Sequence, residues 1–297
     1  MKNVAASVRD RLANQARATG VPLAALMERF ALGRLLWRLS RSEAADRFIL
    51  KGAQLFSLWA GAPHRPTRDI DLLGSGDSSP ESLKTFFTDL LAKPAEPEDG
   101  LVWGTVEAGR IREDQRYEGV RVTTKATLAG ALVPVQVDIG FGDAITPEAV
   151  PIEWKELLDF PEARLLAYPP ETVIAEKLEA VVTLGMANSR MKDFFDLDWL
   201  ARNREFEADT LRRAVQATFE RRGTELPVEM PVALTAEFGG NAAKITQWNA
   251  FLKKSRLEGE ALESVTSRLA SFLGPIVFSG NTVTFWKPAT GWSTAKP

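Results

Sequence analysis

The sequence contains no cysteine and a single histidine, His64, among its 297 residues. Disulfide bonds, zinc sites of the Cys/His type and Cys-His catalysis are therefore excluded, and a Ser-His-Asp triad would depend on that one imidazole. No apolar run approaches the ~18 residues that cross a bilayer, and the first residues lack the apolar core of a secretory signal. We expect a cytoplasmic protein without a membrane partner.

The composition is typical of a globular protein, with 45% hydrophobic and 26% charged residues. At about 150 residues per domain, the length fits two domains or one core with an appendage. The net charge of −2 is unevenly distributed, because residues 1–68 carry +8 and residues 69–168 carry −10. This contrast fits either a polyanion held near a carboxylate cluster or solvated helix faces, and the pI of 5.8 favours the second reading.

The apolar pattern divides the chain into three parts. We predict an N-terminal helical segment (1–45), a core with a mixed sheet (46–165) and a C-terminal, mainly helical domain (166–297), which together make an α+β fold. Helices are predicted over 4–19, 22–40, 52–60, 80–91, 170–185, 191–203, 208–222, 240–254 and 258–273. Strands are predicted over 47–51, 67–73, 101–107, 119–127 and 133–141, and a closing hairpin around 279–281, flanked by 276–278 and 283–286.

Two Asp-x-Asp pairs occur, one at Asp69 and Asp71 and one at Asp196 and Asp198, and chance alone supplies about one such pair in this composition. Their contexts differ. Polar and apolar residues alternate around the first pair, so both carboxylates project from one face of a strand, roughly 7 Å apart along it. The second pair lies on a predicted helix and points in different directions. Only the first pair has the geometry of a divalent-cation site, and a solvated strand end is the alternative.

A third carboxylate and a glycine turn accompany the first pair. Asp138 lies in a strand whose apolar residues share the other face, and it joins Asp69 and Asp71 if the two strands are neighbours. The strand that ends at Lys51 leads through Gly52 into a helix, and the free N–H groups of such a helix start suit the β- and γ-phosphates of a nucleotide. Three carboxylates, two Mg²⁺ ions about 3.5–4 Å apart and a triphosphate form an apparatus for in-line nucleotidyl transfer.

Five ordered motifs carry a resemblance to a known family. They are KGAQLF (51–56), TRDID (67–71), VDIGFGD (137–143), IAEKLEA (174–180) and SRMKDFFDL (189–197). Together they resemble the AbiEii/AbiGii toxin family, whose members are similar to DNA polymerase β-type nucleotidyltransferases. The resemblance implies a toxin of a bacterial toxin–antitoxin or phage-defence system, paired with an AbiEi-like antitoxin. Some members transfer nucleotides from NTPs to tRNA acceptor ends, which blocks aminoacylation and stops translation.

The resemblance also implies roles for single residues. Asp69 and Asp71 would be metal ligands, and Asp138 would be the third metal-binding carboxylate and the candidate base for the acceptor hydroxyl. Lys177 would hold triphosphate oxygens as a point charge, and Asp193 would orient Lys177 or contact the nucleotide. The residues implied in nucleotide binding are Lys51, Gly52, Ala53, Thr67, Arg68 and Lys177.

One departure from the family pattern is Ala53, where Gly or Ser is usual, so a hydroxyl contact to phosphate is missing. His64, Arg65, Arg68, Arg190 and Lys192 are further candidates for contact with phosphates or an RNA 3′ end, with simple solvent exposure as the alternative.

Two other functional hypotheses stay open. The same chemistry could act on a small molecule such as an aminoglycoside, or on a protein side chain, and the acidic middle segment would suit a cationic acceptor. Alternatively, the fold could serve as a non-catalytic interaction module, which the intact Asp69, Asp71, Asp138 and Lys177 argue against. The leading hypothesis is a Mg²⁺-dependent nucleotidyltransferase toxin that uses an NTP and modifies the 3′ end of an RNA, with tRNA favoured.

Overall fold

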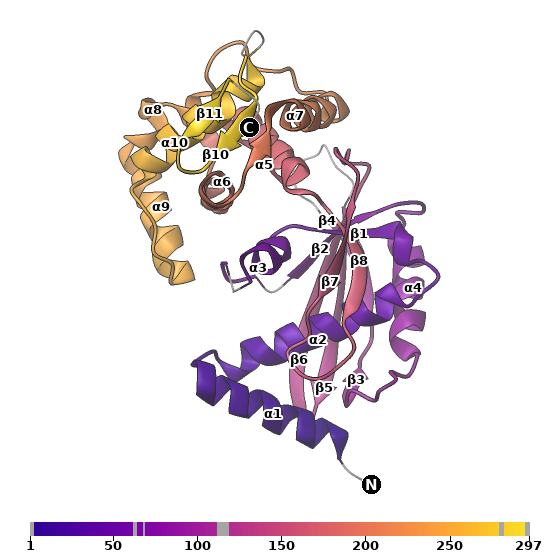
Figure 1. The fold of residues 1–297 in the computed structure, drawn as a ribbon. Helices are drawn as coiled ribbons and strands as arrows, with labels where there is room; N and C mark the ends of the chain where they lie inside the picture. Colours follow the sequence, from indigo (N-terminus) through magenta and orange to yellow (C-terminus); the bar gives the residue numbers. More distant parts are fainter. Residues whose placement is uncertain (1–2, 62–63, 68, 112–118, 279–281, 295–297) are drawn as a thin grey trace. The chain divides into compact units, whose positions relative to one another are not determined.

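The computed structural model describes residues 3–61, 64–67, 69–111, 119–278 and 282–294. They form two compact units: a sheet unit (1–142 and 150–167) and a helical unit (143–149 and 168–297). The fold is α+β, as predicted, with a mixed sheet in one unit and mainly helices in the other (Figure 1). Within the described ranges, no helix has both the length and the hydropathy needed to traverse a bilayer.

The described residues of the sheet unit form four α-helices and eight strands. The helices are α1 (Val4–Thr19), α2 (Leu23–Ser40), α3 (Gln54–Ala60) and α4 (Pro80–Ala92). The strands are β1 (Phe48–Lys51), β2 (Asp69–Gly74), β3 (Leu101–Trp103), β4 (Glu107–Ile111), β5 (Gly119–Leu128), β6 (Ala131–Phe141), β7 (Val150–Trp154) and β8 (Ala163–Ala167). Their order is β3-β5-β6-β2-β1-β8-β7, with β4 also paired to β5.

Strand directions and burial decide which face of this sheet carries polar groups. β6 runs parallel to β2 and β8 parallel to β1, and the other pairs are antiparallel. Val120 and Val122 of β5 and Val137 of β6 are buried on one face, where each contributes roughly 1.5–3 kcal/mol. On that face Phe48 packs against Phe86 of α4, with ring centroids 5.3 Å apart. The other face is left for polar side chains.

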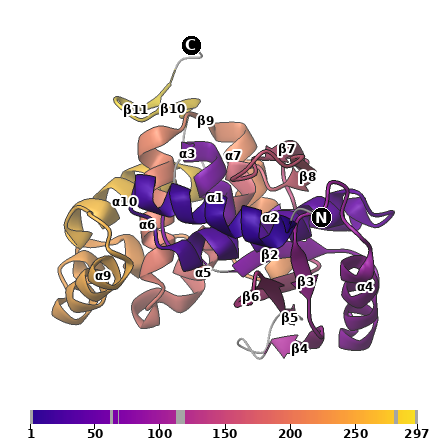
Figure 2. The same ribbon diagram turned by 90° about the horizontal axis from the view of Figure 1, so that it is seen from below.

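Where the structure describes it, the helical unit contains six α-helices and a small sheet. The helices are α5 (Pro170–Leu184), α6 (Met191–Asn203), α7 (Ala208–Arg222), α8 (Ala236–Gly239), α9 (Ala242–Ser255) and α10 (Leu262–Val277). Pro170 occupies the first turn of α5, where its missing N–H breaks no helical bond. Strands β9 (Phe206–Glu207), β10 (Phe285–Lys287) and β11 (Gly291–Ser293) pair in the order β11-β10-β9 and lie side by side in Figure 2.

The predicted closing hairpin is wrong in its first strand. Ile276 and Val277 end helix α10, because they continue its buried stripe through Leu269 and Leu273 at helical spacing. The expected tip at 279–281 lies outside the described residues. The hairpin that the structure contains joins β10 to β11 instead, nearer the C-terminus.

Other element boundaries also differ from the sequence pattern. The strand predicted over 101–107 is two strands, β3 and β4. Regular pairing with β5 stops after Trp103, where the Gly104 N–H donates a hydrogen bond to the Lys125 carbonyl. Strands β7 and β8 were not predicted. Pro151, which cannot donate a ladder bond, obscures β7, and an edge strand such as β7 tolerates it. Helix α3 begins at Gln54, two residues after Gly52.

Candidate metal and nucleotide site

Four adjacent strands place charged residues in one row across the polar face of the sheet. The register pairs Lys51 of β1 with Asp71 of β2, Asp71 with Asp138 of β6, and Asp138 with Arg121 of β5. Paired residues of neighbouring strands project to the same side, so these four side chains share one face. Asp69, two residues before Asp71, lies on that face as well.

The three aspartates predicted to converge do so. Asp69, Asp71 and Asp138 each offer a carboxylate oxygen within 4.8 Å of the other two, and all three side chains are half-buried. We call this group the carboxylate cluster. Hard oxygen ligands at this spacing, on rigid strands, fit Mg²⁺ better than a softer metal, and like charges this close favour a bound cation.

Gly52 is required by the approach of Asp71 to the turn after β1. Its φ of +76° lies in the left-handed region that favours glycine, and a Cβ built there would stand 1.9 Å from the Asp71 Oδ2 atom. Any side chain at position 52 would therefore push the Asp71 carboxylate away from the cluster. Ala53, the next residue, is 5% exposed and precedes α3 in a helical conformation.

Thr67 and Gln54 hold the first aspartate. The Thr67 Oγ1 donates a hydrogen bond of 2.7 Å to the Asp69 Oδ1, and the Gln54 amide donates to the Asp69 carbonyl at 3.2 Å. These bonds fix the side chain and the backbone of Asp69 at the start of β2. Arg68, between Thr67 and Asp69, lies outside the described residues.

Arg121 binds the third aspartate with both ends of its guanidinium. The Arg121 Nε donates to the Asp138 Oδ1 and the Nη2 to the Oδ2, each at 2.8 Å, and the Gln136 amide also donates to Oδ2 at 3.3 Å. The Asp138 side chain is 16% exposed and that of Arg121 43%. Asp138 thus accepts three hydrogen bonds from two neighbouring side chains.

A second charged group, the lysine cluster, lies in the helical unit and consists of Lys177, Arg190, Asp193 and Asp196. The Lys177 Nζ on α5 lies 2.6 Å from the Asp193 Oδ1 and 2.9 Å from the Asp196 Oδ2 on α6. The Arg190 Nε lies 2.7 Å from the Asp193 Oδ2. Two cations thereby balance two carboxylates whose side chains are at most 2% exposed.

The charges around Asp193 determine its ionisation. Burial opposes the charged form, but Lys177 and Arg190 outweigh it and hold the pKa of Asp193 below its ordinary value, although Asp196 nearby acts in the opposite sense. Asp193 therefore stays ionised at neutral pH and holds Lys177 and Arg190 in place.

Arg222 ties together the elements next to Lys177. Its guanidinium bonds Asp143 at 3.0 Å and Glu179 of α5 at 2.9 Å, and it lies 3.5 Å from Glu176. Burial would lower the pKa of Arg222, but these carboxylates raise it above its ordinary value. The network holds α5, and with it Lys177, against α7 and the segment that follows β6.

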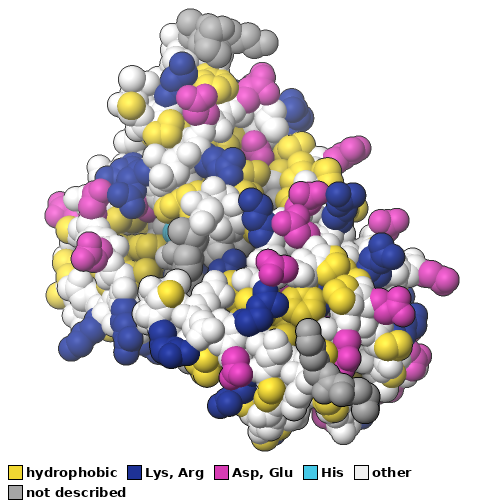
Figure 3. Space-filling view, turned by 60° about the horizontal axis from the view of Figure 1, so that its bottom comes forward, with side chains coloured by type: hydrophobic (Ala, Val, Ile, Leu, Met, Phe, Trp, Pro, Cys, Tyr) yellow, Lys and Arg dark blue, Asp and Glu magenta, His cyan; other side chains and the backbone are white. Residues whose placement is uncertain are grey.

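Two further candidate residues lie in different surroundings. His64 is buried and stacks on Phe56 at a centroid distance of 4.7 Å, while Lys192 is exposed. Figure 3 shows Lys and Arg side chains mixed with Asp and Glu on the face in view, so the charge contrast along the chain produces no single-sign surface there.

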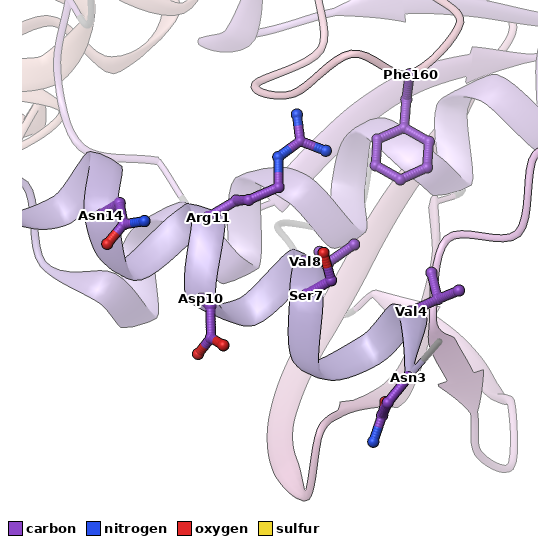
Figure 4. Close-up of a pocket in the computed structure, with 8 residues that line it drawn as sticks. All are labelled: Asn3, Val4, Ser7, Val8, Asp10, Arg11, Asn14 and Phe160. Carbon is purple, nitrogen blue, oxygen red and sulfur yellow. The ribbon is translucent and has the colours of Figure 1, made fainter. Parts of the chain in front are cut away.

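A pocket of about 640 Å³ lies elsewhere in the sheet unit, along helix α1. Figure 4 shows that its lining comes from α1 and its preceding residue, together with Phe160. None of the residues predicted to bind metal or nucleotide lines it.

Sequence reasoning missed Arg121 and Asp196. A signal for Asp196 was present, because Asp193 and Asp196 are three residues apart and share a helix face. Arg121 had no such signal, since its contact with Asp138 depends on the register between β5 and β6.

Comparisons with known proteins agree with these observations. A sequence model of the family described as nucleotidyl transferase AbiEii toxin, type IV toxin–antitoxin system, matches residues 34–271. A comparison with curated proteins found no match.

Two solved structures, both from Helicobacter pylori, are similar to this chain. JHP933 is 17% identical, with a TM-score of 0.48 over 82% of this chain and 88% of that chain. A protein described as a candidate nucleotidyltransferase is 18% identical, with a TM-score of 0.46 over 80% and 88% of the two chains.

Proposed function

Because the chain belongs to the AbiEii nucleotidyl transferase toxin family of type IV toxin–antitoxin systems, we propose that it transfers a nucleotide from an NTP to the 3′ end of an RNA. The favoured acceptor is tRNA, whose modified end could no longer be aminoacylated, so that translation stops. The observation that carries this proposal is the meeting of Asp69, Asp71 and Asp138 within 4.8 Å. The reaction would take place in the cytoplasm, where both substrates are found.

The carboxylate cluster is assigned to magnesium. Asp69, Asp71 and Asp138 would hold it, and two ions there would supply neutralisation of the triphosphate charge and activation of the attacking hydroxyl. The fit rests on the all-oxygen donor set and on Gly52, which leaves room for the Asp71 carboxylate.

Asp138 is the proposed acceptor of the proton. The acceptor hydroxyl oxygen forms a bond to the α-phosphorus of the NTP, the bond from that phosphorus to the β-phosphate breaks, and pyrophosphate leaves. The hydroxyl proton passes to Asp138. Thr67 contributes to the reaction indirectly, because its hydrogen bond holds the proposed metal ligand Asp69 in place.

The nucleotide is assigned to the segment Lys51, Gly52 and Ala53, to Thr67 and Arg68, and to Lys177. Lys177 would contact triphosphate oxygens while Asp193 and Asp196 orient its ammonium group. A substitution of Lys177 should accordingly raise the KM for the NTP more than the KM for the acceptor. An AbiEi-like antitoxin is the proposed partner.

The test is incubation of the full chain with each α-³²P-labelled NTP, Mg²⁺ and total RNA, followed by sequencing of the labelled species. The expected result is label at the 3′ end of tRNA with at least one NTP. The Asp71→Asn protein is the negative control, because any RNA label that it produces would come from a contaminating enzyme. Absence of labelled RNA with all four nucleotides would overturn the proposal. Label on an aminoglycoside or on protein would show that the acceptor is a small molecule or a protein and not RNA.

A further inference from the structure

The third carboxylate of the proposed metal site is already occupied by protein donors. A carboxylate offers about four lone-pair positions, and Arg121 uses two and Gln136 a third on Asp138. Asp69, by contrast, accepts one side-chain hydrogen bond from the described residues, that of Thr67. Asp138 and Asp69 are therefore not equivalent toward a cation.

The two-point hydrogen bond from Arg121 to Asp138 opposes the binding of a cation in two ways. An ion that binds Asp138 must displace or share a charge-assisted, two-point hydrogen bond, which is stronger than a neutral one. It must also approach the positive charge of Arg121. Both effects weaken metal binding while the guanidinium stays in place.

A nucleotide offers the guanidinium another partner. Phosphate oxygens match the fork of an arginine as well as a carboxylate does, and the Arg121 side chain, 43% exposed, has room to turn. Transfer of Arg121 from Asp138 to a phosphate would free the Asp138 Oδ1, leave Oδ2 with the Gln136 bond, and remove the cation that repels the metal.

We propose that Arg121 is a positioning residue that closes Asp138 to metal in the free protein and releases it when a triphosphate binds. This inference rests on the proposed function, because it takes the carboxylate cluster as the metal site. It makes metal and nucleotide binding cooperative, and the coupling is reciprocal: each ligand tightens the other by the same factor.

The test is Mn²⁺ binding to the full chain, followed by electron paramagnetic resonance, with and without a non-hydrolysable NTP analogue. Arg121→Gln should tighten Mn²⁺ binding in the absence of nucleotide by about tenfold, the equivalent of one charge-assisted hydrogen bond. The additional tightening that the analogue causes in the wild type should shrink by the same factor. Arg121→Lys, which keeps the charge but loses the fork, should give an intermediate affinity.

Lys125 provides the matched control. It is an exposed cation on the same strand and the same face, four residues from Arg121 and so about 13 Å away. Lys125→Gln removes the same charge without touching Asp138 and should leave Mn²⁺ affinity within about twofold, since exposed charges beyond a Debye length of ~8–10 Å are largely screened.

Two results would overturn the proposal. Unchanged or weaker Mn²⁺ binding by Arg121→Gln would mean that Arg121 does not compete with the metal. Equal Mn²⁺ binding by the wild type and by Asp71→Asn would mean that the ion does not bind at the carboxylate cluster. Neither measurement uses an acceptor, so a failed RNA-labelling assay would overturn the proposed function and leave this result standing.

Discussion

The carboxylate cluster and the lysine cluster balance their charges differently. In the carboxylate cluster, Asp69, Asp71 and Asp138 are half-buried, and Arg121 pairs with one of the three. In the lysine cluster, Asp193 and Asp196 are almost fully buried, and Lys177 and Arg190 balance them. The first group offers carboxylate oxygens and solvent access for a cation, while the second is a buried brace that fixes the orientation of a lysine.

The difference follows from the cost of burial. A buried ion must be paired closely, because the low dielectric of the interior penalises an unbalanced charge by several kcal/mol. A partly solvated group tolerates an excess of like charge, which a bound cation then relieves. Substitutions should therefore spare stability in the first cluster and damage it in the second.

The largest expected effect is on activity in the carboxylate cluster. Asp71→Asn should lower the rate of nucleotidyl transfer at least ~1000-fold, or about 4 kcal/mol, because it removes a metal ligand that Gly52 leaves room for. The stability of the chain should change little, since asparagine keeps the size and shape of the half-buried side chain. Single-turnover assays and urea unfolding measure the two quantities. A large loss of stability would show that the cluster is structural.

The lysine cluster should respond in the opposite way. Lys177→Met leaves Asp193 and Asp196 buried without their shared cation and should destabilise the helical unit by roughly 3–4 kcal/mol. Urea unfolding followed by circular dichroism gives the free energy. Lys192→Met is the matched control, because Lys192 is exposed on the same helix as the two aspartates, and it should change stability by less than ~0.5 kcal/mol. Equal effects of the two substitutions would contradict the contrast between the clusters.

The strand-borne part of the site could be predicted from the sequence because it depends on local alternation. The period of two around Asp69 and Asp71 fixes their common face, and the same pattern around Asp138 places it opposite the apolar residues of β6. The convergence of the two strands required one further assumption, that β6 neighbours β2, and the register Asp71 with Asp138 confirms it.

The rest depends on long-range register or on packing, which the local pattern does not contain. Arg121 meets Asp138 because the β5–β6 hairpin is in one particular register out of several. The end of α10 at Val277 depends on burial against the rest of the helical unit, and that burial outweighs the helix-breaking preference of Pro275. Expected roles of Lys177 and Asp193 in nucleotide binding stay predictions.

A third charged group, in the sheet unit, is buried like the lysine cluster, but its charges are paired at longer distances. Arg34 contacts Asp99 at 3.2 Å and Glu156 at 3.5 Å, and the side chains of all three are at most 3% exposed. Burial raises the pKa of Glu156 to about 7 from its ordinary value of 4.5, although Arg34 opposes the shift. The folded chain therefore keeps the proton on Glu156 at pH values where the unfolded chain has lost it.

This difference predicts a pH dependence of stability. Between pH 4.5 and about 7 the folded state binds more protons than the unfolded state, so stability should fall as pH rises through that window, by roughly 2–3 kcal/mol in total. Glu156→Gln should remove this decline, as measured by urea unfolding at pH 5 and pH 8. Glu153→Gln, at a half-exposed position of the same segment, should keep it. A decline that persists in Glu156→Gln would assign it to another group.

The smallest expected effect on stability isolates the contact between Gly52 and Asp71. Gly52→Ala and Gly130→Ala both place a side chain at a positive φ, of 76° and 81°, and each should lose about 1 kcal/mol of stability. The two positions differ in their surroundings, because a Cβ at Gly130 meets nothing within 4 Å whereas one at Gly52 would clash with the Asp71 carboxylate. Gly52→Ala should therefore also weaken Mn²⁺ binding and nucleotidyl transfer, whereas Gly130→Ala should leave both unchanged. If both variants kept wild-type metal affinity, the position of Asp71 against the turn would not matter for the site, and the carboxylate cluster would tolerate more movement than its rigid strands imply.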